Sequence, residues 1–232
     1  MASTRLPGKV LADLGGRTVL EWVVRAAWES GVCDRVVVAT STDSTDDAVE
    51  SECQRLGVSF HRGDLDDVLG RFLGALIHEP DDGTVIRLTA DCPLLDPQLI
   101  AMCVRAFEKS GVDYLSTIRR RTLPRGLDVE VMSHRALKRA GDIALGYQRI
   151  HVTPAIYEDP AEFTTADIAF EPVAGDLRVT IDTSEDLTAV RALVDTLGDR
   201  PHGWQDVIRT LRSHPEIVGI NRGVKQKALE DG

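Results

Sequence analysis

Hydrophobic positions along the chain fall into two kinds of run. Short runs rich in β-branched residues cover positions 35–39, 84–88 and 177–181. Such runs are typical of strands that are buried on both faces, as in a parallel sheet. We therefore predict three buried strands at these positions.

Longer segments between these runs carry apolar residues at helical spacing, three or four positions apart. Several are followed directly by glycine, the residue at which helices most often end. The predicted helices cover positions 19–30, 46–56, 64–78, 97–110 and 185–197. Strands that alternate with helices of this length predict an α/β fold, with a mostly parallel sheet covered by helices on both faces.

The middle third of the chain departs from this alternation. Positions 114–117, 127–131 and 164–170 have the pattern of strands, and a basic loop over 119–126 joins the first two. The length of 232 residues fits one α/β unit. We expect a single domain over 1–218, followed by a loose polar tail over 219–232.

The start of the chain has the composition of a loop. An open α/β sheet usually opens with a strand that delivers the chain into its first ligand loop. Here the loop-like residues 2–9 come first. We therefore expect the first strand to be truncated, through a start placed inside the true reading frame.

Composition narrows the classes of partner. The chain has 27 Lys and Arg against 37 Asp and Glu, a net charge of −10, which argues against broad binding of nucleic acid. Its four cysteines form no C-x-x-C pair, and no apolar run is long enough for a membrane span or a signal peptide. We expect a cytoplasmic protein that binds neither nucleic acid nor membrane.

The N-terminal loop is the strongest candidate for a phosphate site. Arg5 and Lys9 flank Pro7-Gly8, where proline stiffens the loop and glycine lets the backbone approach a ligand. Guanidinium, ammonium and hydroxyl groups together could bind a polyphosphate. The candidate nucleotide-binding residues here are Ser3, Thr4, Arg5 and Lys9. An ordinary exposed basic terminus is the alternative.

Two aspartates follow predicted strands directly. Asp91 comes after the strand at 84–88, and Asp182 comes after the strand at 177–181. If these strands are parallel, both carboxylates emerge at one sheet edge and could share a magnesium ion, which prefers few carboxylates together with phosphate oxygens. The alternative is that both residues only form turns before helices.

Weaker candidates lie in the middle third. Asp128 and Glu130 face the same side of their strand and could bind substrate hydroxyls, or could lie on an exposed sheet face. His151 could contact an anionic substrate, or could be structural. The D-x-D at Asp64 and Asp66 opens a helix, so we interpret it as capping.

These segments together resemble the signature motifs of the cytidylyltransferases that make CMP-activated sugar acids. The closest resemblance is to the branch of the spore coat polysaccharide biosynthesis protein F, which is similar to acylneuraminate and 3-deoxy-manno-octulosonate cytidylyltransferases. The motifs that carry the resemblance occur in the family's order at 3–9, 14–22, 37–40, 60–63, 89–94, 126–131, 151–154 and 181–183.

The resemblance implies a Rossmann-like nucleotide-diphospho-sugar-transferase fold with a mixed sheet. It implies that about 112–170 form a lid or dimerisation subregion of a homodimer. It also implies CTP and Mg²⁺ as ligands. On this basis Arg5 and Lys9 are catalytic and hold the triphosphate, Asp91 and Asp182 bind the metal, and Asp91 also contacts the nucleotide.

The functional hypothesis is transfer of CMP from CTP to an acidic sugar or related acceptor, with release of pyrophosphate, in polysaccharide or surface-glycan biosynthesis. Two alternatives remain. One is a glycosyltransferase of related fold, which would use a nucleotide sugar through a D-x-D at a strand end. The other is an inactive, N-terminally truncated binding module.

Overall fold

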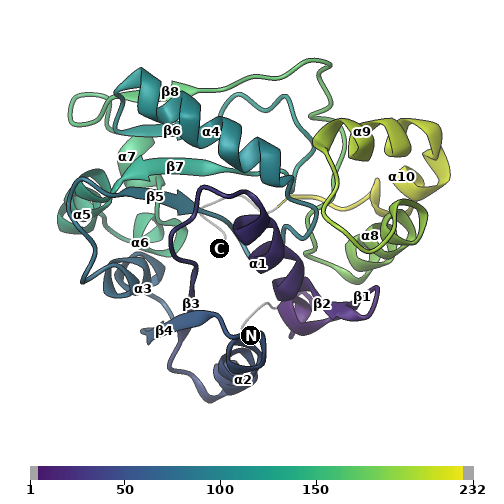
Figure 1. Ribbon diagram of the computed structural model, residues 1–232, viewed down its shortest axis with the longest axis horizontal. Helices are drawn as coiled ribbons and strands as arrows, with labels where there is room; N and C mark the ends of the chain where they lie inside the picture. The colour runs from purple at the N-terminus through teal and green to yellow at the C-terminus, as the bar shows by residue number, and fades with distance from the viewer. Residues whose placement is uncertain (1–4, 227–232) are drawn as a thin grey trace.

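The computed structural model describes residues 5–226 (Figure 1). Its helices are α1 (Val19–Glu29), α2 (Asp47–Leu56), α3 (Val68–Ala75), α4 (Pro97–Ser110), α5 (His134–Ile143), α6 (Tyr147–His151), α7 (Pro154–Tyr157), α8 (Ser184–Leu197), α9 (Trp204–Ser213) and α10 (Pro215–Asn221), with short 3-10 helices η1 (Lys9–Leu11) and η2 (Ser44–Asp46). Its strands are β1 (Asp13–Leu14), β2 (Arg17–Thr18), β3 (Val37–Ser41), β4 (Ser59–Gly63), β5 (Thr84–Arg87), β6 (Tyr114–Ser116), β7 (Glu130–Ser133) and β8 (Thr165–Asp167).

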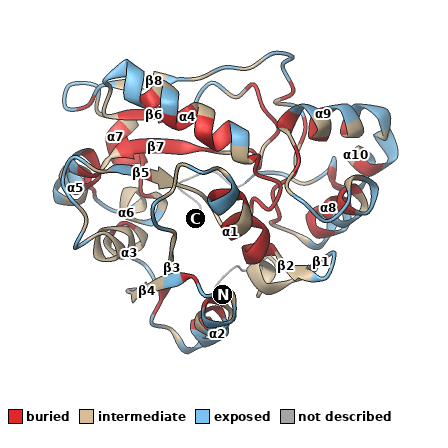
Figure 2. Ribbon diagram, in the orientation of Figure 1, coloured by how far each residue is buried: buried red, intermediate tan, exposed pale blue. Residues whose placement is uncertain are grey.

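The largest sheet among the described residues has four strands in the order β5-β7-β6-β8. Alternate residues of β7 point to opposite faces: Val131 packs with α4 residues in one core cluster, and Met132 packs with α5 residues in another. Figure 2 shows β6 and β7 as buried, with α4 along the sheet. Helices therefore cover both faces, as the sequence predicts.

The strand pairing departs from the predicted mostly parallel sheet. In the four-stranded sheet β7 runs antiparallel to both β5 and β6, and β6 pairs with β8 in parallel. The other parallel pair, β3 and β4, forms a separate two-stranded sheet beside α2 and α3 (Figure 1). The mixed character comes from β7, because the chain folds back through the basic loop before entering it.

The strand predicted over 177–181 is not formed. This segment is extended and buried, but its ladder consists of one parallel bridge between Arg178 and Arg125. Its other backbone bonds go to a loop, including Ile181 N–H to the carbonyl of Asp91 at 2.9 Å. A β-branched apolar run predicts burial here correctly, while its backbone partners are loops rather than a neighbouring strand.

The observed helices match their predicted ranges more closely than the strands do, because the residues that cap a helix lie next to it in the sequence. Thr183 and Asp186 form the predicted capping box at the start of α8. Within residues 5–226, no helix combines the length and apolarity needed to cross a membrane.

The two ends of the described chain can be compared with the predictions of a truncated first strand and a loose C-terminal tail. Residues 5–12 form turns and η1, and the first strand described is the two-residue β1. Helix α10 extends through Asn221, so the loose tail predicted to begin at position 219 is wrong for its first residues. Asn221 is 5% exposed and is therefore part of the folded body.

Candidate active site

Asp91 and Asp182 come together, as the sequence predicts. Asp91 lies in the loop after β5, and Asp182 lies between the extended segment and α8. The hydroxyl of Thr180 donates to the carbonyl of Asp91 at 3.2 Å, in addition to the Ile181–Asp91 backbone bond. These bonds hold the two loops together, so the carboxylates of Asp91 and Asp182 lie in the same site.

Lys9 lies between the two carboxylates. Its Nζ donates to Asp91 Oδ2 at 2.7 Å and to Asp182 Oδ1 at 2.8 Å. Gly8 supplies the left-handed turn, with φ of 73°, that leads into η1 and Lys9. Burial alone would lower the pKa of Lys9, but the charges and hydrogen bonds of both aspartates outweigh it and raise the pKa above its usual value.

The second oxygen of Asp182 is held by two guanidinium groups. Arg5 Nη2 lies 3.1 Å from Oδ2, and Arg178 Nη2 donates to it at 2.8 Å. Burial would raise the pKa of Asp182, but Lys9, Arg178 and Arg5 together hold it below its usual value. The neighbouring cations therefore stabilise the ionised form of the Asp182 carboxylate.

Asp186 orients the guanidinium of Arg178. Its carboxylate, with no exposed surface, accepts from Arg178 Nε at 2.8 Å and Nη2 at 2.9 Å. It also accepts from the backbone amides of Asp182 and Thr183 at 3.0 and 3.2 Å. The predicted site residues do not include Arg178 and Asp186, because Arg178 lies before the helix and no local sequence pattern pairs it with Asp186 in the first turn of α8.

A second group of charges adjoins the Asp91–Asp182 pair. Gly126 lies so close to this pair's loop that an added Cβ would stand 2.4 Å from the amide nitrogen of Thr180. On either side of Gly126, Arg125 bonds through its backbone to Leu177 and Val179, and Asp128 accepts two bonds from Arg121 at 2.7 and 3.3 Å.

The guanidinium of Arg125 is half-buried and forms no ion pair or side-chain hydrogen bond with any residue from 5 to 226. Burial and the like charges of Arg121 and Arg178 lower its pKa, and the charges of Asp128 and Asp182 offset this only in part. A cation in this position favours an anionic ligand, because burial without a counter-charge is costly.

Glu130 is not placed for the predicted contact with substrate. It is 3% exposed, and its Oε1 accepts from the hydroxyls of Tyr114 and Thr153, both at 2.6 Å. Its Oε2 accepts from Arg87. Because β7 is covered on both faces, Glu130 forms an internal ion pair instead of facing a ligand.

The remaining predicted residues stay predictions. Ser3 and Thr4 lie outside the described residues. His151 ends α6, and the described contacts of Asp91 and Asp182 do not include it. The next residue, Val152, has a φ of 77°, an uncommon conformation for a β-branched residue, and packs into the second core cluster.

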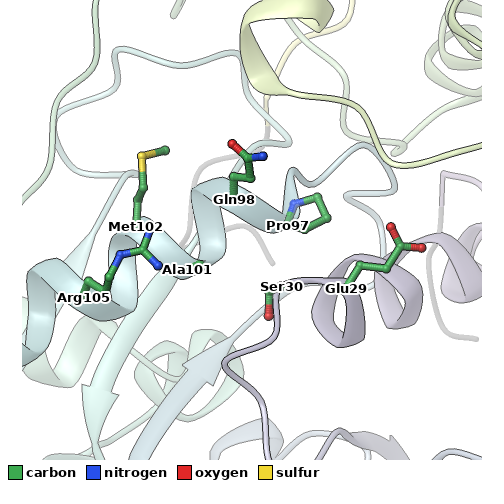
Figure 3. Close-up of a pocket in the computed structure, with 7 residues that line it drawn as sticks. All are labelled: Glu29, Ser30, Pro97, Gln98, Ala101, Met102 and Arg105. Carbon is green, nitrogen blue, oxygen red and sulfur yellow. The ribbon is translucent and has the colours of Figure 1, made fainter.

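The pocket in Figure 3 is separate from this site. It lies between the C-terminal end of α1 and the first turns of α4. Its lining residues are Glu29, Ser30, Pro97, Gln98, Ala101, Met102 and Arg105.

The chain is similar to known proteins over nearly its whole length. A family model described as cytidylyltransferase matches residues 1–204. The spore coat polysaccharide biosynthesis protein SpsF of Bacillus subtilis (strain 168) is 35% identical over 230 residues, covering 94% of this chain and 93% of that protein.

Solved structures agree. A cytidylyltransferase from Leptospira borgpetersenii superposes with a TM-score of 0.89 at 28% identity, over 98% of this chain and 95% of that one. A CMP:2-keto-3-deoxy-manno-octonic acid synthetase complexed with CTP shares the fold, with a TM-score of 0.62 at 18% identity over 85% and 95% of the two chains. The α/β nucleotidyltransferase fold expected from the sequence is confirmed, and the chain belongs to the cytidylyltransferase family, whose members are CTP-dependent nucleotidyltransferases.

Proposed function

We propose that this enzyme transfers CMP from CTP to an acidic sugar or related acceptor, with release of pyrophosphate. The observation that carries the proposal is the Lys9 ammonium held between Asp91 and Asp182, with Arg5 beside it. This arrangement combines cations for a polyphosphate with paired carboxylates for a metal ion. The similarity to SpsF supports a role in the synthesis of a polysaccharide or surface glycan.

We also propose that Asp91 and Asp182 hold Mg²⁺. Each carboxylate has an oxygen within 2.8 Å of the Lys9 Nζ, so the two groups are close enough for one cation to lie between them, and a metal ion would take the place of this ammonium. Within residues 5–226, no group of three or more His, Cys, Asp or Glu side chains forms a closed metal site. Two carboxylates that leave the other positions to phosphate and water fit Mg²⁺, since this ion is usually held through one or two carboxylates and substrate phosphates.

In the proposed reaction an acceptor oxygen attacks the α-phosphorus of CTP. A bond forms between this oxygen and phosphorus, the bond from phosphorus to the bridging oxygen breaks, and the acceptor proton leaves to solvent. Arg5 and Lys9 offset the charge that builds on the leaving pyrophosphate. Bound Mg²⁺ would supply further charge stabilisation and help orient the phosphates.

The acidic acceptor is supported by Arg125. Its guanidinium is half-buried near Arg121 and Asp128 and forms no direct ion pair among the described residues. A carboxylate could accept a bidentate pair of hydrogen bonds from it. Asp128, already bonded to Arg121, offers acceptor atoms for sugar hydroxyls at the same edge.

The glycosyltransferase alternative has less support. Asp64 Oδ1 accepts from the backbone amides of Asp66 and Asp67, so this D-x-D forms the turn before α3, and the residue that caps the helix is Asp67. The truncated binding module, the homodimer and the cytoplasmic location stay predictions.

Pyrophosphate release from CTP, measured with a panel of sugar acids, phosphosugars and phosphonates, tests the proposal. We expect turnover with at least one acidic acceptor and none with its neutral analogue. Calorimetry with CTP and with nucleotide sugars separates the two enzyme hypotheses. Failure of the wild-type enzyme to bind CTP in the presence of Mg²⁺ would overturn the proposed function.

A further inference from the structure

Helix α10 places a buried polar residue next to the hydrogen-bond network of Asp186, Arg178 and Asp182. The helix packs against α8 and α9, and Ile217 belongs to the main core cluster. Its last residue, Asn221, is 5% exposed. This part of the chain lies beyond the region 1–204 that the cytidylyltransferase family model matches.

Asn221 is connected to Asp182 through two residues. Its Nδ2 donates to Asp186 Oδ1 at 2.9 Å and more distantly to the carbonyl of Arg178 at 3.4 Å. The Asp186 carboxylate in turn fixes the Arg178 guanidinium, which bonds to Asp182 Oδ2. A side chain on α10 therefore restrains the carboxylate that we assign to the metal.

The residues after α10 make two further contacts with the same cations. Arg5 Nη1 donates to the carbonyl of Lys225 at 3.1 Å, and Arg178 Nη1 donates to Gln226 Oε1 at 2.9 Å. Both guanidinium groups that bind Asp182 Oδ2 are thus also held from the C-terminal side. We call Asn221, Lys225 and Gln226 the C-terminal clamp.

We propose that the C-terminal clamp positions Asp182 for binding CTP and metal. With Arg5 and Arg178 fixed on Oδ2, the other oxygen, Oδ1, is directed at Lys9 and Asp91. Partners that orient a metal ligand in this way commonly tune metal affinity. Asn221 is therefore a positioning residue, and the inference rests on the proposed function of this site.

A purely structural role for the C-terminal clamp makes a different prediction. If Asn221 only anchors α10, its loss lowers the unfolding temperature and leaves the affinity of the folded enzyme for CTP unchanged. If the clamp positions Asp182, CTP binding weakens at a temperature where the variant is fully folded, and the KM for the acceptor is unchanged.

The test compares Asn221→Leu with wild type by calorimetric titration of CTP in the presence of Mg²⁺, without acceptor, and by a thermal melt. Leucine keeps the volume of asparagine and removes its hydrogen bonds. We expect CTP affinity to fall roughly tenfold. The control is Glu216→Gln, an exposed change on the same helix, which should bind as wild type does.

A second variant covers the case in which Asn221→Leu does not fold. Gln226 is exposed, so Gln226→Ala removes one contact to Arg178 without disturbing the core, and we expect about a twofold loss of CTP affinity. Wild-type affinity in the folded Asn221→Leu variant, or in Gln226→Ala if the first is unfolded, would overturn the clamp and leave the proposed function standing. Absence of CTP binding by wild type would overturn both.

Discussion

Lys9 balances the negative charge of the site through its ammonium group. Asp91 and Asp182 are parts of different loops, and each would repel the other without a cation between them. Lys9 supplies that cation from a third segment, η1. The same group can donate to phosphate oxygens, so one side chain both stabilises the carboxylate pair and serves the proposed chemistry.

Replacement of Lys9 should therefore affect catalysis strongly. In Lys9→Met the stem is kept and the charge is lost, and we expect kcat/KM for CTP to fall about a hundredfold, as when one preorganised donor is removed from a transition state. Steady-state pyrophosphate release measures the change. Lys109→Met, an exposed change in the last turn of α4, should leave the rate unaltered. Equal rates for Lys9→Met and wild type would remove Lys9 from the reaction.

Arg125 should determine affinity for an acidic acceptor. Substituting Arg125→Leu removes the half-buried guanidinium and should raise KM for the acceptor roughly tenfold, because hydrogen bonds to a charged group are among the stronger ones. KM for CTP should change little. Arg120→Leu is the matched control, since Arg120 is exposed in the same loop. An equal effect of the two substitutions on KM for the acceptor would point to general electrostatic attraction instead.

Local sequence patterns predict the charged residues at strand and loop ends, but they do not distinguish an open strand face from a covered one. Asp91 and Asp182 come together, and Lys9 joins them in the structure. Glu130 does not join them, because the alternation along β7 is the same whether a face is solvated or packed against a helix. Only tertiary packing distinguishes these cases.

Among the contacts between elements, one glycine allows the basic loop to lie directly against the segment before Asp182. Gly126 has a φ of 105°, and its α-carbon approaches the backbone of Thr180 too closely for any side chain. The extended segment before Asp182 depends on this approach, because the one parallel bridge that it forms with other residues of 5–226 is the one to Arg125. The sequence pattern of this segment predicts a strand, yet in the structure its backbone contacts a loop instead of forming a ladder with a neighbouring strand.

A side chain at position 126 should therefore destabilise the folded state by more than backbone strain alone. We expect Gly126→Ala to lower the free energy of unfolding by about 3 kcal/mol, since overpacking adds to the cost of a left-handed φ. Gly111→Ala is the control: Gly111 has a φ of 67° and open space around it, so only the strain of about 1 kcal/mol applies. Urea unfolding measures both, and equal losses would mean that the contact at Thr180 relaxes freely.

At the scale of the whole molecule, the sequence predicts the elements better than their arrangement. Helices such as α8 carry their own caps and periodicity, so local sequence is sufficient to place them. The insertion of β7 between β5 and β6 depends on where the chain returns after the basic loop. Pairing of strands distant in sequence is a property of the packed molecule, and no local pattern encodes it.

The buried network under the site should also give the molecule an acid-sensitive stability. Burial would raise the pKa of Asp186, but the bonds from Arg178 and from backbone amides outweigh it and hold the pKa below its usual value. A carboxylate whose pKa is lower in the folded state than in the unfolded chain contributes stability above its unfolded pKa of about 3.9. That contribution is lost as pH falls from this value through the lowered pKa of the folded state.

We therefore expect the free energy of unfolding, measured with urea between pH 7 and pH 3, to be level at first and to decline below about pH 4. Asp186→Asn should be less stable than wild type at pH 7, because Arg178 loses its buried counter-charge, and its decline in acid should be shallower. Asp195→Asn, an exposed change on the same helix, should follow the wild-type curve. Parallel curves for wild type and Asp186→Asn would show that Asp186 titrates alike in the folded and unfolded chains, and that the acid sensitivity arises elsewhere in the molecule.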